Sequence, residues 1–189
     1  MMGAMDIAGW EERYRSGGSG GDSPTTLLVE IAEKLAPGTA IDLACGAGRN
    51  ALYLAEQGWT VTAVDGSERA IELLQLRFAA RGLQVDTKVA DLTSPTFRMP
   101  PDAYDLILIA FYLQRDLFAK VKAAVRPGGV VVAIAHTPEP GEKWSEKRAG
   151  PGELREFFNG WELLWEYEGP SRDPAHRRPV AEIAARRLV

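Results

Sequence analysis

Residues 40–50, AIDLACGAGRN, predict a ligand-binding turn at the end of a buried strand. A short apolar run that contains Asp42 stops at Gly46-Ala47-Gly48 and gives way to the helix-like sequence ALYLAEQG. Two glycines without a Cβ atom allow a sharp bend and let a ligand approach bare main chain. The helix that follows presents free N–H groups and its positive dipole end, so we expect a negative or electron-rich ligand over the turn.

The glycine turn alone fits two kinds of nucleotide ligand. Residues 46–51, GAGRNA, also satisfy the relaxed dinucleotide pattern, so an NAD-type site is open. Asp42 and Asn50 favour the other choice, because an acid four residues before the first glycine suits an ammonium group better than a pyrophosphate. The β-branched run TVTAV then ends at Asp65, where an acid is placed to accept hydrogen bonds from a ribose diol.

Composition indicates one compact intracellular domain. The chain has 189 residues and a net charge of −4, with 22 Lys and Arg against 26 Asp and Glu. The absence of a basic block argues against a nucleic-acid substrate. One cysteine, Cys45, excludes an internal disulfide, and two histidines leave no zinc-like cluster, so no metal site is expected. Neither a membrane-spanning run nor a signal peptide is expected, and the cytoplasm is the predicted location.

Strand-like and helix-like segments alternate along most of the chain, which is typical of a parallel α/β sheet wound on both sides. Residues 1–23 are expected to form a mobile segment that can act as a lid, because GGSGGDSP follows a short amphipathic helix. Residues 24–189 are expected to form a single domain. We read residues 23–25 as a helix cap and RPGG, residues 126–129, as a structural turn. The expected strands are 40–44, 60–65, 83–90, 104–110, 130–135, 161–167 and 180–188.

Several motifs together resemble the class I S-adenosylmethionine-dependent methyltransferases in order and spacing. They are IDLACGAGRN, VTAVDGS, VADLTS, YDLILIAF and RPGGVVV. More narrowly, LACGAGRNALYLAEQGWTVTAVDGS, YLQRDLF and GELREFF followed by GWE are similar to the small tellurite-resistance and thiol methyltransferase group. The resemblance covers roughly residues 10–187. It implies a doubly wound, Rossmann-like, seven-stranded sheet of order 3-2-1-4-5-7-6 with strand 7 antiparallel, and S-adenosylmethionine as the cofactor.

The candidate cofactor-binding residues surround the ends of the first strands. Asp91 follows the third strand and can accept from an adenine amine, although it also fits a simple turn. In the resembled group an aromatic-basic segment near the N-terminus folds over the cofactor, which makes Arg13 a lid candidate; a frayed surface helix is the alternative. The full set is Asp42, Ala44, Gly46, Gly48, Asn50, Asp65, Gly66, Ser67, Asp91, Leu92, Phe111, Trp10 and Tyr14.

The candidate catalytic residues are Tyr112, Arg115 and His136. Tyr112 follows the most apolar strand, and His136 ends the next one, so both are expected at the ligand edge of the sheet. His136 fits a base, a donor that orients the substrate, or a surface residue. Arg115 is expected to reach the substrate or the donor's carboxylate, or to be an ordinary exposed arginine. Residues 137–150 form a charged loop suited to a flap, in which Trp144 is either an anchor or a substrate contact.

Methyl transfer to a small, soft acceptor is the function that these features predict. Such a nucleophile, a thiol or a selenium or tellurium oxyanion, needs positioning more than a strong base, and the chain offers no obvious acid-base dyad. The basic residues at 172–178 could steer an anion, but we read them as a solvated loop. Two alternatives remain: an NAD-type oxidoreductase, and a non-catalytic cofactor-binding protein of methyltransferase fold. The sequence does not determine the oligomeric state.

Overall fold

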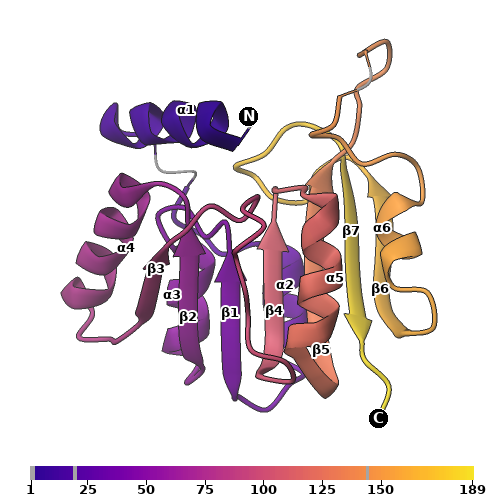
Figure 1. Cartoon of the computed structure of the whole chain (residues 1–189), viewed down its shortest axis with the longest axis horizontal. Helices are drawn as coiled ribbons and strands as arrows, with labels where there is room; N and C mark the ends of the chain where they lie inside the picture. The colour runs from indigo at the N-terminus through magenta and orange to yellow at the C-terminus, as the bar shows by residue number, and fades with distance from the viewer. Residues whose placement is uncertain (1–2, 19–20, 144) are drawn as a thin grey trace.

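A seven-stranded sheet forms the centre of the protein (Figure 1). The computed structural model describes residues 3–18, 21–143 and 145–189, with side chains of the first helix described from residue 7 onward. The strands are β1 Thr39–Leu43, β2 Thr60–Asp65, β3 Asp86–Val89, β4 Tyr104–Ala110, β5 Val125–His136, β6 Glu162–Gly169 and β7 Val180–Arg186. Their order is β3-β2-β1-β4-β5-β7-β6, and β7 is antiparallel to both of its neighbours, so the predicted topology is confirmed.

Six helices in the described residues accompany the sheet. They are α1 Gly3–Arg15, α2 Thr26–Ala32, α3 Arg49–Glu56, α4 Glu68–Ala80, α5 Arg115–Ala124 and α6 Glu153–Phe157. Apolar side chains of α2, α3 and α4 pack on one face of the sheet, and those of α5 and α6 pack on the other. The central strand β4 serves both clusters, because its side chains alternate between the two faces. None of the helices described has the length and apolar character to cross a bilayer.

The segment RPGG differs from the prediction, since it lies inside β5 rather than in a separate turn. Between Tyr104↔Val125 and Leu106↔Val130 the pairing of β4 with β5 shifts, so that extra residues of β5 bulge outward. Two backbone hydrogen bonds to Arg187 hold this bulge: Gly128 donates to its carbonyl, and its N–H donates to Gly129. The residue after β7 therefore pairs with the bulge and keeps β5 continuous, where the sequence predicted a separate turn before the strand.

The start of α2 has its cap within the predicted residues 23–25, but without a side-chain capping bond. Thr25 is the N-cap residue. Its hydroxyl and its N–H both donate to Oδ1 of Asn50, at 2.9 and 2.8 Å. The segment before α2 is thus fastened to the start of α3, and α2 ends at Ala32, earlier than its apolar pattern suggested.

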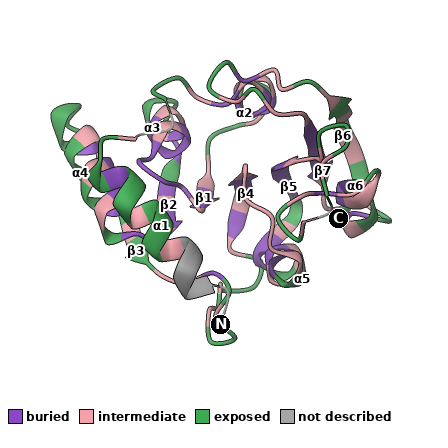
Figure 2. Cartoon of the chain, turned by 90° about the horizontal axis from the view of Figure 1, so that it is seen from above, coloured by how far each residue is buried: buried purple, intermediate pink, exposed green. Residues whose placement is uncertain are grey.

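Helix α1 lies across the edge of the sheet at which β1, β2 and β4 end (Figure 1). Seen from above, it runs beside α4 and over the ends of β2 and β3 (Figure 2). The prediction for residues 1–23 falls partly on residues 1–2 and 19–20, which lie outside the described residues. The described part places α1 over the ligand edge of the sheet.

We predict that Gly48→Ala lowers the free energy of unfolding by about 2–4 kcal/mol. Gly48 has φ +81°, and an added Cβ would collide with Leu74 of α4. The loss combines about 1–2 kcal/mol for a left-handed alanine with the overpacking penalty. Urea unfolding measures it.

Gly82→Ala is the matched control, because Gly82 has φ +64° and no atom near its added Cβ. We expect this variant to lose only about 1 kcal/mol. Equal losses for the two variants would contradict close packing of α4 on the glycine turn.

Candidate active site

The carboxylate of Asp65 organises the glycine turn. Its Oδ2 accepts a hydrogen bond from the Gly46 N–H at 2.8 Å, and its Oδ1 accepts one from the Ser67 N–H at 2.9 Å. Burial raises the pKa of Asp65, and these backbone N–H donors oppose that shift. Asp65, which was predicted to bind a ribose, therefore also joins the turn after β1 to the start of α4. At that start the Ser67 hydroxyl caps the helix by accepting a hydrogen bond from the Ala70 N–H.

Asp42 lies behind the turn as a buried acid with an unsatisfied oxygen. Its relative exposure is 1%, and its Oδ2 has no hydrogen-bond partner among the described residues. Burial, reinforced by the negative charge of Asp65, raises the pKa of Asp42 to about 8. A cationic group close to this oxygen would supply the missing partner and lower that pKa.

Two of the predicted cofactor-binding residues, Gly66 and Asp91, line one hollow of about 440 Å³. Val89 lines it from β3, and Ile7 and Glu11 line it from α1. The Asp91 carboxylate accepts from the N–H and the hydroxyl of Thr93, at 2.8 and 2.7 Å, so its turn role is present. The hollow lies between α1 and the ends of β2 and β3, beside the glycine turn.

Helix α1 covers the bare main chain of this region. A Cβ added at Gly46 would collide with the hydroxyl of Tyr14, and one added at Gly66 would meet Cγ1 of Ile7 at 2.8 Å. Tyr14 is buried, whereas Trp10, whose ring centroid lies 6.0 Å from that of Tyr14, is half exposed. The side chains of α1 therefore sit on the positions at which the sequence predicts the donor.

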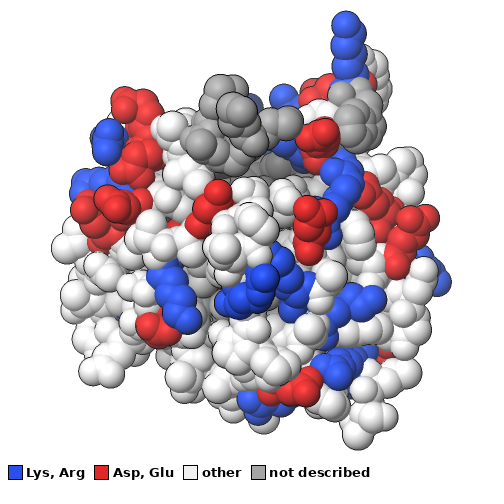
Figure 3. All heavy atoms as spheres, viewed as in Figure 1, with Lys and Arg blue, Asp and Glu red and all other residues white. Residues whose placement is uncertain are grey.

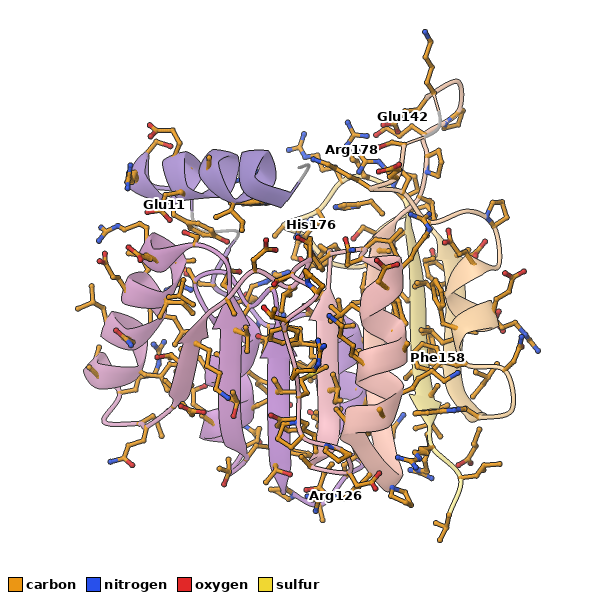
Figure 4. The ribbon with its side chains drawn as sticks, viewed as in Figure 1. Glu11, Arg126, Glu142, Phe158, His176 and Arg178 are labelled. Atoms are coloured by element: carbon orange, nitrogen blue, oxygen red, sulfur yellow. The ribbon has the colours of Figure 1, made fainter. Side chains whose placement is uncertain are left out.

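Glu11 fixes α1 to the N-terminus of α4 (Figure 4). Its Oε2 accepts from the hydroxyl of Ser67 at 2.5 Å and from the N–H of Arg69 at 3.2 Å. The hydrogen bond from Ser67 is the main cause of the lowered pKa of Glu11. A carboxylate is well placed there, because the helix start offers unpaired N–H groups and positive charge. The sequence analysis did not identify this contact.

A group of rings lies at the ends of β4 and β5. Phe111 follows β4 with φ +60°, a conformation that is strained for an aromatic residue. Its ring stacks on His176, with centroids 3.5 Å apart and planes at 6°. The ring of His136, at the end of β5, lies 5.3 Å from both. The structure thus unites the predicted residues Phe111 and His136 with His176, which the sequence analysis left in a solvated loop.

Arg49 and Asp173 hold that loop against α3. Their side chains form a buried ion pair of 2.7 Å, with exposures of 10% and 3%. Asp173 Oδ1 also accepts from the Ala175 N–H at 2.9 Å, which shapes the turn before His176. Neither residue was predicted, because no local pattern pairs residues so far apart in sequence.

Several other candidates are engaged elsewhere. The guanidinium of Arg115 binds both carboxylate oxygens of Glu153, at 2.6 and 3.0 Å, and the carbonyls of Glu146 and Arg148. Leu92 packs in the core. Trp144 lies outside the described residues. Arg115 therefore anchors the loop before α6, and its role towards substrate stays a prediction.

Two of the basic residues at 172–178, Arg172 and Arg178, are ion-paired rather than simply solvated. Arg172 bonds to Glu30 and to the buried Glu182, and Arg178 bonds to Glu142 at 3.1 Å (Figure 4). Because their charges are matched, these arginines offer less positive field than the sequence suggests.

Comparisons with known proteins show which family the chain resembles in sequence. Residues 40–129 match the sequence profile of the methyltransferase domain family. TehB of Haemophilus influenzae, described as a probable S-adenosyl-L-methionine-dependent methyltransferase, is 26% identical over 144 residues, which cover 72% of this chain and 50% of that protein. Hemagglutinin 1 of Eikenella corrodens is 30% identical over 146 residues, covering 74% and 49%. The chain spans about half the length of these relatives.

Two solved structures have the same fold. The crystal structure of TehB from Haemophilus influenzae gives a TM-score of 0.76 at 26% identity, covering 94% of this chain and 67% of that chain. The 1,6-didemethyltoxoflavin-N1-methyltransferase of Burkholderia thailandensis, solved with 1,6-didemethyltoxoflavin and S-adenosylhomocysteine, gives 0.74 at 19% identity, covering 98% and 88%. At that lower identity the likeness concerns the fold alone.

We predict that Asp42→Asn becomes increasingly stabilising, relative to the wild-type chain, as pH rises from about 4 to 8. Folded Asp42 keeps its proton up to about pH 8, whereas the unfolded chain loses it near 3.8. In this window the unfolded chain binds fewer protons, so the wild-type protein loses stability as pH rises. Asparagine cannot ionise.

Urea unfolding of both proteins across this pH range gives the difference between their free energies of unfolding. The contributions of the other titrating groups largely cancel in that difference. Parallel pH profiles would mean that Asp42 is already ionised in the folded protein.

Proposed function

We propose that this chain, a class I S-adenosylmethionine-dependent methyltransferase by family and close to TehB, transfers a methyl group to a small acceptor with a soft nucleophile. The observation that carries the proposal is the unsatisfied, buried carboxyl oxygen of Asp42 behind a turn of bare main chain. An ammonium group of an adenosyl amino acid would lower the pKa of this carboxyl and pair with its carboxylate, whereas a phosphate would raise that pKa further and gain no ion pair.

The described residues fit such a donor in three places. Asp42 would pair with its ammonium, Asp65 would face its ribose, and the hollow at Gly66 and Asp91 would take its adenine. When bound, S-adenosylmethionine supplies a methyl group on a sulfonium, which already carries an excellent leaving group. Because Tyr14 and Ile7 cover Gly46 and Gly66, α1 has to shift before the donor can occupy these positions. The N-terminal helix then serves as the lid that the sequence suggested.

The acceptor is proposed to be a thiol or a selenium or tellurium oxyanion. The resemblance to the tellurite-resistance and thiol methyltransferase group, together with the similarity to TehB, supports this class. For such nucleophiles the chain's task is to position and desolvate. Acidic and basic side chains lie side by side on the face seen in Figure 3, which supports a small molecule over a nucleic acid.

Calorimetry with S-adenosylhomocysteine and with NADH tests the donor, and a labelled donor with thiols, selenite and tellurite tests the acceptor. The proposal expects S-adenosylhomocysteine to bind, NADH not to bind, and at least one soft acceptor to be methylated. Binding of NADH alone would support an oxidoreductase. Donor binding without any methylated product would favour a non-catalytic protein of this fold.

Asp65→Asn is predicted to weaken S-adenosylhomocysteine binding by about 1–3 kcal/mol, the usual effect of leaving buried polar partners unpaired. The variant loses one of the two acceptors that Gly46 and Ser67 use, together with the charge that faces the ribose. Calorimetry measures the change.

Asp86→Asn provides the control, because Asp86 is an exposed acid on the neighbouring strand β3. It should bind the ligand as the wild-type chain does. If the Asp65 variant also kept wild-type affinity, the predicted ribose contact would be wrong.

A further inference from the structure

The only two histidines of the sequence meet at the ligand edge of the sheet. His136 is the last residue of β5, and His176 comes from the connection between β6 and β7. Their ring centroids lie 5.3 Å apart, with planes at 45°. Figure 4 shows His176 above the end of β4, below the level of α1. Two imidazoles therefore face the same small region beside the donor turn.

Contacts with Phe111, which follows β4, and with Arg49 of α3 fix the loop that carries His176. Its ring stacks flat on Phe111, whose left-handed backbone directs the aromatic side chain across the end of β4. The buried pair of Arg49 and Asp173 holds its loop, and the guanidinium of Arg49 also lies 5.6 Å from the Phe111 ring centroid. Since Arg49 directly follows Gly48, one helix start positions both the donor turn and His176. A preorganised imidazole of this kind is typical of a site that handles a proton.

The surroundings favour uncharged imidazoles. Burial lowers the pKa of His136, and it lowers the pKa of His176 to about 4. The charged groups that act on the pair come from α1, α3 and two loops; the positive ones are Arg13, Arg49, Arg148 and Arg178, and the negative ones are Asp173 and Glu142. Arginines outnumber acids here, so both rings are uncharged at neutral pH and each keeps a ring-nitrogen lone pair. An anion formed beside them is stabilised by the arginines and would in turn raise the pKa of the rings, which favours transfer of a proton to them. In addition, Nδ1 of His136 is buried without a partner among the described residues.

Resting on the proposed function, we propose that His136 and His176 form the acceptor site and that their ring nitrogens take the proton of a thiol acceptor. The S–H bond breaks, the proton moves to an imidazole nitrogen, and the sulfur lone pair attacks the methyl carbon of the donor. The new S–C bond forms as the bond between that carbon and the sulfonium sulfur breaks, and its electron pair stays on the donor, which leaves as a neutral thioether. The imidazolium then releases its proton to water. A thiol with an ordinary pKa near 8.5 is mostly protonated at neutral pH, so it needs such a base.

Proton NMR of the two histidine rings tests the pair without any turnover. With two histidines in the sequence, the spectrum contains two ring Cε1–H signals, which His136→Gln and His176→Gln assign. Both pKa values should lie below the ordinary 6.5, and His136→Gln should raise the pKa of His176, because His136 contributes to lowering it. If the two histidines titrated independently, each with a pKa near 6.5, the proposed pair would be wrong.

His176→Phe separates the proton role from the stacking role, because phenylalanine keeps the stack on Phe111 but has no ring nitrogen. For an alkyl thiol we expect kcat to fall by about 10²-fold, within the range of general base catalysis, with S-adenosylhomocysteine affinity unchanged. For a thiophenol, which is already ionised at neutral pH, the fall should be much smaller. Equal losses for the two thiols, or no loss, would overturn the proton role.

The two proposals fail in different ways. If the wild-type chain bound S-adenosylhomocysteine but methylated no thiol, the thiol acceptor would be wrong, and the proton role of the histidines would be wrong with it. If the wild-type chain methylated thiols and the His176 variants did so equally well, only the role of the histidines would be wrong.

Discussion

The site depends on one carboxylate that accepts two backbone hydrogen bonds. Asp65 ends β2 and binds the N–H of Gly46, after β1, and the N–H of Ser67, before α4. Parallel neighbours in a sheet end at the same edge, so a single side chain can set the spacing of both loops. These two hydrogen bonds hold the turn, and the same oxygens are the ones proposed to bind the ribose. Structure and ligand binding therefore share one group.

A buried ion pair between Arg49 and Asp173 fixes the opposite side of the site. Arg49 begins α3, immediately after the glycine turn, and binds Asp173 in the connection between β6 and β7. Removing either partner would leave an uncompensated buried charge, which is strongly destabilising. The pair makes the position of His176 depend on the same helix start that the donor turn uses. The proposed donor and acceptor sides of the site are therefore both connected to the start of α3.

The sequence predicted the features that depend on local pattern. The bounds of β2 and β4, the glycine turn and the Ser67 cap follow from periodicity and from residue type, and the structure has them where they were expected. The predicted third strand, 83–90, is shorter in the structure, and the predicted seventh strand, 180–188, ends at Arg186. The position of β7 did not follow from pattern and came from family resemblance. RPGG was misread because its bulge is completed by Arg187, far along the chain. His176 was missed for the same reason, because only the packing of its loop on α3 brings it to Phe111.

A crystal structure of the chain with S-adenosylhomocysteine tests the central claim most directly. The account predicts the adenosyl group over Gly46 and Gly66, its amino group within hydrogen-bond distance of Asp42, and Tyr14 and Ile7 moved off the glycines that they now cover. Crystals grown with saturating ligand in which Tyr14 and Ile7 still occupied these positions would contradict it.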